Sequence, residues 1–319
     1  MKYRLSVLLG AVCYGILSTI VTKAYEQGYT LGQIVGSQLL TGACLAWCLV
    51  LFARWKKRPG DEGHWTASER SGGTVPTWKQ RLVLMAAGMP TAVTGLLYYQ
   101  SLRYIPNSLA ILLLFQFTWM GVLVHAIGKR QRPNGVMLAT VAVLLGGTLL
   151  AAGVLDQGLS RFHWLGVLFG LSSAVSYTAF ILLSGRAVPG AHPASRSAWM
   201  ITGGLALVFV LFPPAFLIDG TLLTGLLPFG VMLGLFGAFL PPLLYAIGVP
   251  RIGEGLTGIL GAAELPVAVL LSAVVLHERV SAIQWLGVGL VLLGVSLPEL
   301  LRRAGGTGSG SGGRLRIGG

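Results

Sequence analysis

The chain has 319 residues, of which 54% are hydrophobic and only 10% are charged, against about 25% in typical soluble domains. This composition excludes a soluble protein and indicates one that is embedded in a membrane. The net charge of +13 would suit nucleic-acid binding, but the basic residues lie mostly between apolar segments, so we expect no nucleic-acid partner.

Apolar segments of about 20 residues recur along the whole chain, and each is long enough to cross a bilayer as a helix. The longest connection between them is Arg54–Arg81, which is too short for a separate soluble domain. The sequence therefore predicts an all-α polytopic membrane protein with ten transmembrane helices. The segments are residues 5–25, 31–53, 82–102, 107–128, 134–155, 163–185, 197–218, 226–249, 255–276 and 281–301.

The basic residues fall mainly on one side of the expected membrane. If the N-terminus is cytoplasmic, 19 of the 23 lysines and arginines lie inside, and Lys23, Arg103, Arg161 and Arg279 lie outside. This is the positive-inside pattern. It predicts an integral protein of a prokaryotic inner or plasma membrane, with both termini cytoplasmic and with membrane lipids as partners.

The two halves of the chain resemble each other. A shift of 163 brings Tyr14 onto Tyr177, and after the basic loop a shift of 147 brings Tyr98 onto Tyr245. Five segments per half is an odd number, so the second half would be inserted upside down, as in the inverted repeats of secondary transporters. We expect a first repeat over 1–155 with a basic cytoplasmic loop at 54–81, a second repeat over 156–303, and a flexible Gly/Ser-rich tail over 304–319. The sequence leaves open whether this tail is native.

Apart from Glu299, two residues from the end of the last segment, Glu264 is the only acidic residue inside a membrane-length apolar segment. It lies about nine residues from the start of its segment, which places it roughly 13 Å deep in a core of about 30 Å. A carboxylate at that depth should face the interior of the bundle or a wet cavity. The functional interpretation is a carboxyl that binds substrate or a proton, because burial disfavours the charged form. The structural interpretation is a glutamate that bonds Ser, Thr or backbone groups of a neighbouring helix.

The residues from Glu264 to Arg279 resemble a known sequence pattern. They combine an E-x-P motif at Glu264–Pro266 with Glu278 at the end of the segment, and a Gly-rich segment follows. The stretch is similar to the second EamA repeat of the drug/metabolite transporter superfamily, and with the duplicated halves the resemblance covers about residues 1–303. It implies a ten-helix bundle that moves small metabolites or drugs, usually outward, through a central cavity.

The first half departs from this pattern. Phe117 and Trp119 occupy the E-x-P positions, and Gln131 stands where the resemblance implies a glutamate. We therefore expect any acid-dependent step to belong to the second half. Gln116 lies next to the counterpart of Glu264 and could bond substrate or the carboxyl, although bonding to a helix backbone is an equal alternative.

Further candidate binding residues lie on the polar or aromatic faces of other segments. For the tyrosines and Trp119 the alternative is a place in the interfacial belt, and for the small residues it is close helix packing. With those named above, the predicted substrate- or proton-binding set is Glu264, Gln116, Trp119, Tyr14, Ser18, Tyr98, Ser176, Tyr177 and Tyr245.

Helix-breaking residues occur at related places in the two halves. Gly88 and Pro90 are expected to interrupt the third segment, and Gly237 and Pro241 the eighth; such interruptions mark the sites and moving parts of transporters. We expect further kinks at Pro266 and at Pro213–Pro214. Pro90, Gly237, Pro241 and Pro266 are thus the predicted gating positions.

The sequence favours a secondary transporter that exports or exchanges small metabolites, amino-acid-like compounds or cationic drugs by alternating access. Protons are a possible coupling ion, and the oligomeric state is left open. The alternatives are a channel or a lipid-translocating protein, with an intramembrane enzyme more distant. His277 and Glu278 begin an H-E-x-x-H motif, but Ser281 stands at its fifth position. We expect no enzyme activity, no metal and no cofactor.

Overall fold

The computed structural model describes residues 1–56, 76–128, 135–151, 163–252 and 254–306, and these ranges are almost entirely helical. Short distorted stretches accompany the α-helices: a 3-10 turn, η2 (Ala215–Leu217), and two π-helical stretches, η3 (Leu222–Leu226) and η4 (Gly234–Phe239). The α-helices are α1 (Lys2–Glu26), α2 (Leu31–Lys56), α3 (Trp78–Ser101), α4 (Asn107–Leu114), α5 (Phe117–Gly128), α6 (Gly135–Ala151), α8 (Trp164–Arg186), α9 (Pro193–Leu211), α10 (Leu227–Leu233), α11 (Leu240–Ile252), α12 (Glu254–Gly261), α13 (Glu264–Val275) and α14 (Ala282–Gly306).

Within the described ranges, six helical stretches are long and apolar enough to cross a membrane. They are Lys2–Glu26, Leu31–Phe52, Trp78–Ser101, Trp164–Arg186, Pro193–Leu211 and Leu222–Val249. Shorter apolar helices occupy the other four predicted segments, at Asn107–Gly121, Leu138–Leu150, Ile259–Val275 and Ala282–Leu297. Every apolar segment expected from the sequence thus contains apolar helix.

The later helices of the two halves begin and end at corresponding positions. α4 and α12 both have 8 residues, and α5 and α13 both have 12. α4, α5 and α6 begin at 107, 117 and 135, while α12, α13 and α14 begin at 254, 264 and 282. Each pair is separated by the same 147 residues that align the two halves in sequence.

The fourth and ninth segments are each divided into two helices, so the expectation of one continuous helix over 107–128 and one over 255–276 is wrong. The divisions fall at residues 115–116 and 262–263. Pro266 has no N–H to bond the Ala262 carbonyl, and the Leu265 N–H bonds that oxygen at 3.1 Å instead. In the fourth segment the Gln116 N–H makes the same kind of tightened bond to the Leu113 carbonyl at 3.2 Å.

The third segment is not interrupted at Gly88 and Pro90, contrary to expectation. α3 runs through both residues. A single proline removes one backbone hydrogen bond, which packing can offset. The Pro90 carbonyl accepts hydrogen bonds from the hydroxyls of Thr94 and Ser176, each at 2.8 Å. The bond from Ser176 joins α8 to α3.

In the eighth segment the helix is distorted where the sequence predicts it. Gly237 lies in η4, where the Leu240 N–H bonds to the Leu235 carbonyl five residues back, and Pro241 follows at the start of α11. Pro213–Pro214 do not kink a helix; they follow the end of α9 at Leu211. At the C-terminus, α14 continues to Gly306, two residues beyond Ala304, where the flexible tail was expected to start.

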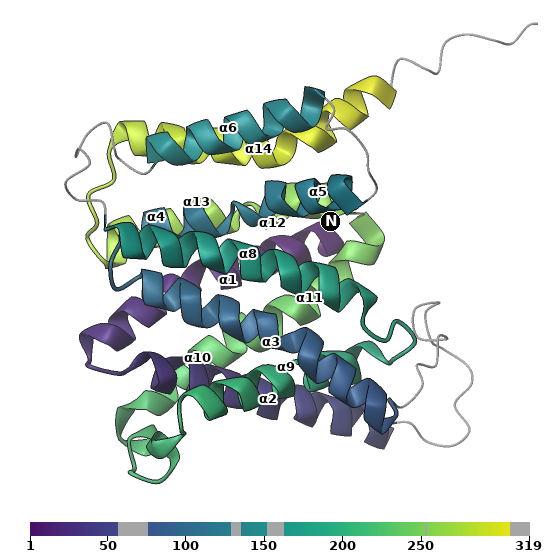
Figure 1. Cartoon of the computed structure of the whole chain (residues 1–319), viewed down its shortest axis with the longest axis vertical. Coiled ribbons are helices and arrows are strands. Elements are labelled where there is room, and N and C mark those ends of the chain that lie inside the picture. Colours follow the sequence, from purple (N-terminus) through teal and green to yellow (C-terminus); the bar gives the residue numbers. More distant parts are fainter. Residues whose placement is uncertain (57–75, 129–134, 152–162, 253, 307–319) are drawn as a thin grey trace, which may run out of the picture.

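The helices form an elongated bundle with a paired layer at one edge (Figure 1). α6 and α14 run side by side in that layer, and α2, α9 and α10 lie at the opposite edge. α1 lies deep between them and packs against α11, α12 and α13. The bundle thus places the start of α13, with Glu264, against α1.

Candidate functional site

Glu264 is the first residue of α13, directly after the break at 262–263. The first turn of a helix has free backbone N–H groups and the positive end of the helix dipole, which favours a carboxylate there. α1 approaches closely at this point: a Cβ on Gly15 would lie 2.8 Å from the Glu264 carbonyl oxygen. Glycine at position 15 therefore allows α1 to hold the start of α13 inside the bundle.

Four tyrosines lie near enough to the Glu264 carboxyl to interact with it electrostatically. Tyr14 of α1, Tyr98 of α3, Tyr177 of α8 and Tyr245 of α11 each interact electrostatically with it. The Tyr14 and Tyr245 rings stack, with centroids 6.2 Å apart. We call these five residues the tyrosine–glutamate cluster. It joins helices from both halves and contains five of the nine predicted binding residues.

The members of this cluster are not tightly enclosed. The side chains of Glu264, Tyr14, Tyr177 and Tyr245 are only partly buried although they face the bundle interior, while Tyr98 is buried. Among the described residues, no lysine or arginine lies within ion-pair distance of Glu264. The carboxyl is therefore available to a ligand that carries a positive charge or a hydrogen-bond donor.

Gln116 and Trp119 do not join the cluster. The buried Gln116 amide nitrogen donates to the Leu112 carbonyl at 3.0 Å and to the Thr148 hydroxyl of α6 at 2.7 Å. Its amide oxygen accepts from Trp119 Nε1 at 2.9 Å. Gln116 thus makes the backbone bond that was the alternative interpretation, and it ties α4 to α6.

The two predicted serines differ in their contacts. Ser176 donates to the Pro90 carbonyl and so ties α8 to α3. Ser18 is 1% exposed and interacts with the Tyr98 hydroxyl, yet neither oxygen completes a hydrogen bond. Ser18 therefore borders the cluster on its Tyr98 side.

Sequence reasoning missed Gln38 as a neighbour of the cluster. Its amide oxygen accepts from the Tyr99 hydroxyl at 2.9 Å, and its amide nitrogen would lie 2.8 Å from a Cβ on Gly237. Gln38 lies inside the apolar run 31–53, five residues after Gln33, and a polar side chain within such a run is a signal of the same kind that singled out Glu264. Gln38 links α2 and α3 to the distorted eighth segment.

Glu278 caps the start of α4 from the other half of the chain. One carboxylate oxygen accepts from the Asn107 N–H at 2.8 Å, and the other accepts from the Ser108 hydroxyl at 3.1 Å and the Ser108 N–H at 3.4 Å. His277, with a φ of 55°, turns the chain after α13 so that Glu278 can reach α4. The sequence placed Glu278 at the end of its apolar segment but did not indicate the helix that it caps.

Replacing Glu278 with alanine should therefore destabilise the protein. A capping carboxylate at a helix start contributes about 1–2 kcal/mol, so the thermal unfolding temperature in detergent should fall by a few degrees. Glu278→Gln keeps one acceptor and should fall between wild type and alanine, and Ser108→Ala should have the smallest effect. An alanine variant as stable as wild type would show that the cap does not contribute.

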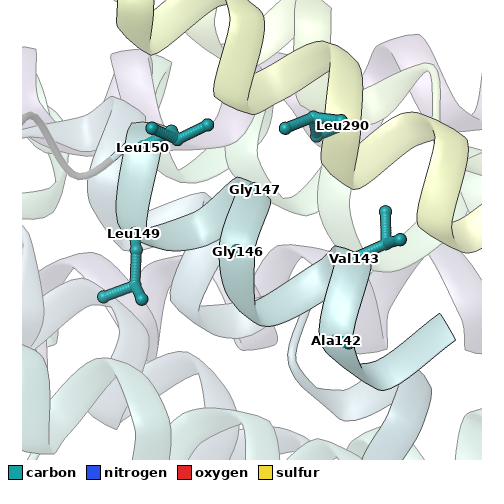
Figure 2. Close-up of a pocket in the computed structure, with 7 residues that line it drawn as sticks. All are labelled: Ala142, Val143, Gly146, Gly147, Leu149, Leu150 and Leu290. Atoms are coloured by element: carbon teal, nitrogen blue, oxygen red, sulfur yellow. The ribbon is translucent and has the colours of Figure 1, made fainter. Parts of the chain in front are cut away.

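An apolar groove of about 650 Å³ lies elsewhere, between α6 and α14. Figure 2 shows its lining of Ala142, Val143, Gly146, Gly147, Leu149, Leu150 and Leu290. It contains no residue of the tyrosine–glutamate cluster and no polar side chain, so it offers nothing to orient a polar substrate. Among the described residues, no group of three or more His, Cys, Asp or Glu side chains could hold a metal ion.

Residues 164–298 match the model of the EamA-like transporter family. The protein is similar to the threonine/homoserine exporter RhtA of Escherichia coli K12, with 26% identity over 67% of this chain and 70% of the relative. The second half of the chain thus matches the EamA-type transporters of the drug/metabolite transporter superfamily, as the resemblance seen in the sequence implied. The chain is an integral membrane protein.

Two further relatives align over nearly the whole chain. The uncharacterised transporters sll1319 of Synechocystis and YwfM of Bacillus subtilis are each 25% identical, over 92% of both chains. A solved structure described only as "Crystal structure of protein" has a TM-score of 0.59 and 20% identity, and covers 94% of this chain and 98% of its own. That likeness supports the fold alone.

Proposed function

We propose that this chain is a secondary transporter that exports or exchanges small amino-acid-like metabolites or cationic drugs by alternating access around the tyrosine–glutamate cluster. The observation that carries this proposal is the position of Glu264. Its carboxyl lies inside the bundle, without a cationic partner among the described residues and among four tyrosines from four other helices. An intramembrane carboxyl without a partner is expected to have a functional role.

The helix pattern supports two inverted five-helix repeats, each with an interrupted fourth helix. The divisions at 115–116 and 262–263 are separated by the same offset as the helix starts around them. In transporters with inverted repeats, such divided helices meet near the midplane and form the binding site. With the distribution of basic residues, this supports ten transmembrane helices with both termini cytoplasmic.

The chemistry of the cluster supports a small substrate with a cationic or zwitterionic group. The carboxyl would bind an ammonium group, and the faces of the Tyr14 and Tyr245 rings would add cation–π attraction. A strongly anionic substrate fits poorly, because no lysine or arginine in the described ranges pairs with the Glu264 carboxyl and could bind such a substrate instead. The name of RhtA gives threonine and homoserine, which are zwitterionic, as the compounds to test first.

A channel or a lipid-translocating protein is the alternative. A carrier saturates with substrate and shows counterflow, whereas a channel does neither.

Substrate binding should raise the thermal unfolding temperature of the purified protein. A ligand selective for the native state at 100 times its Kd adds about 2.7 kcal/mol, enough for a shift of several degrees. We expect threonine, homoserine or an organic amine to stabilise the wild type, and a sugar phosphate to have no effect. Stabilisation by sugar phosphates alone would contradict the proposed substrate class.

A further inference from the structure

Five buried polar atoms in the described residues have no hydrogen-bond partner in the protein. The side chains that carry them are 0–6% exposed. Several of them belong to helices that surround the region between Glu264 and Glu278. The atoms are Ser18 Oγ, Thr19 Oγ1, Tyr98 Oη, Asn107 Nδ2 and Ser272 Oγ.

Contacts connect these groups into a path from one acidic residue to the other. The Tyr98 hydroxyl interacts electrostatically with both Glu264 and Glu278, and with the Ser18 side chain. Thr22 lies one turn beyond Ser18 on the same face of α1. Its hydroxyl donates to the Asn107 side-chain oxygen at 3.0 Å.

The path ends at the cap on α4. Asn107 gives its backbone N–H to Glu278, while its side-chain nitrogen stays unpaired. Ser272 closes the same end from α13, where its carbonyl accepts from the Glu278 N–H at 3.1 Å. The unpaired atoms of the path are therefore hydroxyl oxygens, which can donate and accept, and the Asn107 amide nitrogen, which can only donate.

Buried polar groups without protein partners are expected to bond to ordered water, which needs a polar site with two or more partners. If these polar atoms were unpaired only because the helices pack poorly, they would be scattered among apolar side chains. Here the unpaired atoms come from α1, α3, α4 and α13. The interaction of Tyr98 with Ser18 joins α3 to α1, and the hydrogen bond from Thr22 to Asn107 joins α1 to α4.

We propose that Ser18, Tyr98, Asn107 and Ser272 line a water-binding site that connects the Glu264 carboxyl with the Glu278 end of the bundle. Water there completes the hydrogen bonds of the unpaired atoms and gives Glu264 access to solvent from that end. The site adjoins the cluster proposed for transport and rests on that proposal for its role, but its existence can be tested without transport.

Two adjacent tyrosines provide a matched test. Tyr98 and Tyr99 lie on the same helix and are 6% and 3% exposed, but the Tyr99 hydroxyl bonds to Gln38 while the Tyr98 hydroxyl is unpaired. Radiolytic hydroxyl-radical footprinting labels tyrosines next to bound water, so the wild-type protein in lipid nanodiscs can be labelled and analysed by mass spectrometry. We expect Tyr98 to be modified at least fivefold faster than Tyr99. Equal rates would overturn the proposal.

A second variant locates the water. Ser18→Val replaces the hydroxyl with a methyl group, adds a second methyl, and should lower the labelling of Tyr98 severalfold while Tyr99 stays protected, which also reports that the bundle is folded. If Tyr98 keeps its wild-type rate in a folded variant, the water does not lie beside Ser18 and the proposed site is wrong. If Tyr99 becomes labelled, Ser18→Ala, which removes the hydroxyl without adding volume, takes its place with the same expected and contrary results. Because neither measurement uses a substrate, failure of the transport proposal would leave both results interpretable.

Discussion

Glu264→Gln should reduce substrate transport by tenfold to a hundredfold. Glutamine keeps the shape of the side chain and its hydrogen bonding but removes the charge and the titrating proton. A hydrogen bond to a charged group contributes about 1.5–3 kcal/mol, and each 1.4 kcal/mol corresponds to about tenfold in affinity. Initial rates in proteoliposomes should therefore fall, and the remaining rate should no longer depend on pH through this group.

Glu26→Gln is the matched control for this substitution. Glu26 is 53% exposed at the end of α1 and pairs with Lys23 at 2.8 Å. An exposed pair of this kind contributes little, so transport should be unchanged. If Glu264→Gln transports at the wild-type rate with the wild-type pH profile, Glu264 has a structural role only and the proposed coupling is wrong.

Gly88→Ala should prevent stable folding or strongly destabilise the bundle. A Cβ on Gly88 would lie 2.1 Å from the Met200 carbonyl oxygen, and one on Gly203 would lie 2.1 Å from the Met85 carbonyl oxygen. α3 and α9 therefore touch through backbone at both glycines, and neither helix can yield by moving a side chain. Overpacking typically costs about 1–3 kcal/mol, and a backbone clash at this distance should reach or exceed the upper value.

Gly95 offers a control on the same helix. A Cβ there meets no atom within 4 Å, and alanine favours a helix over glycine by about 1 kcal/mol. Gly95→Ala should therefore match or exceed the wild-type unfolding temperature, whereas Gly88→Ala should elute as aggregate or unfold at least 10 °C lower, roughly the shift that 3 kcal/mol or more produces. Equal stability of Gly88→Ala and wild type would refute the close approach of α3 and α9.

The apolar segments could be predicted from the sequence because each is a long run of apolar residues. Pro266 indicated a kink in the ninth segment, but the division of the fourth segment could not be predicted. The break at Phe115–Gln116 contains neither proline nor glycine. It is visible only in the bonding of Gln116 to α6 and in the correspondence with the break before Glu264. Conversely, Pro90 indicated a break that packing against α8 prevents.

Members of the cluster could be predicted where the type of residue places it in the bundle interior. They could not be predicted where the contacts depend on the direction in which a side chain points. Glu264 was identifiable because an acid in an apolar segment must face the interior. Gln116 could be placed next to the counterpart of Glu264, but a position along a helix does not say toward which neighbour a side chain points, and Gln116 bonds to Thr148 of α6. Gln38 was missed because an amide in an apolar segment is a weaker signal than an acidic or aromatic residue.

Counterflow in proteoliposomes tests most directly whether the chain carries substrate at Glu264. Vesicles are preloaded with the unlabelled amino acid or amine that most stabilises the protein, then diluted into a trace of the labelled compound. For the wild type we predict transient accumulation of label above equilibrium, which a carrier produces and a channel cannot, and no accumulation for Glu264→Gln. Label that only equilibrates through the wild type, or overshoots equally in the Gln variant, would contradict transport by alternating access at this carboxyl.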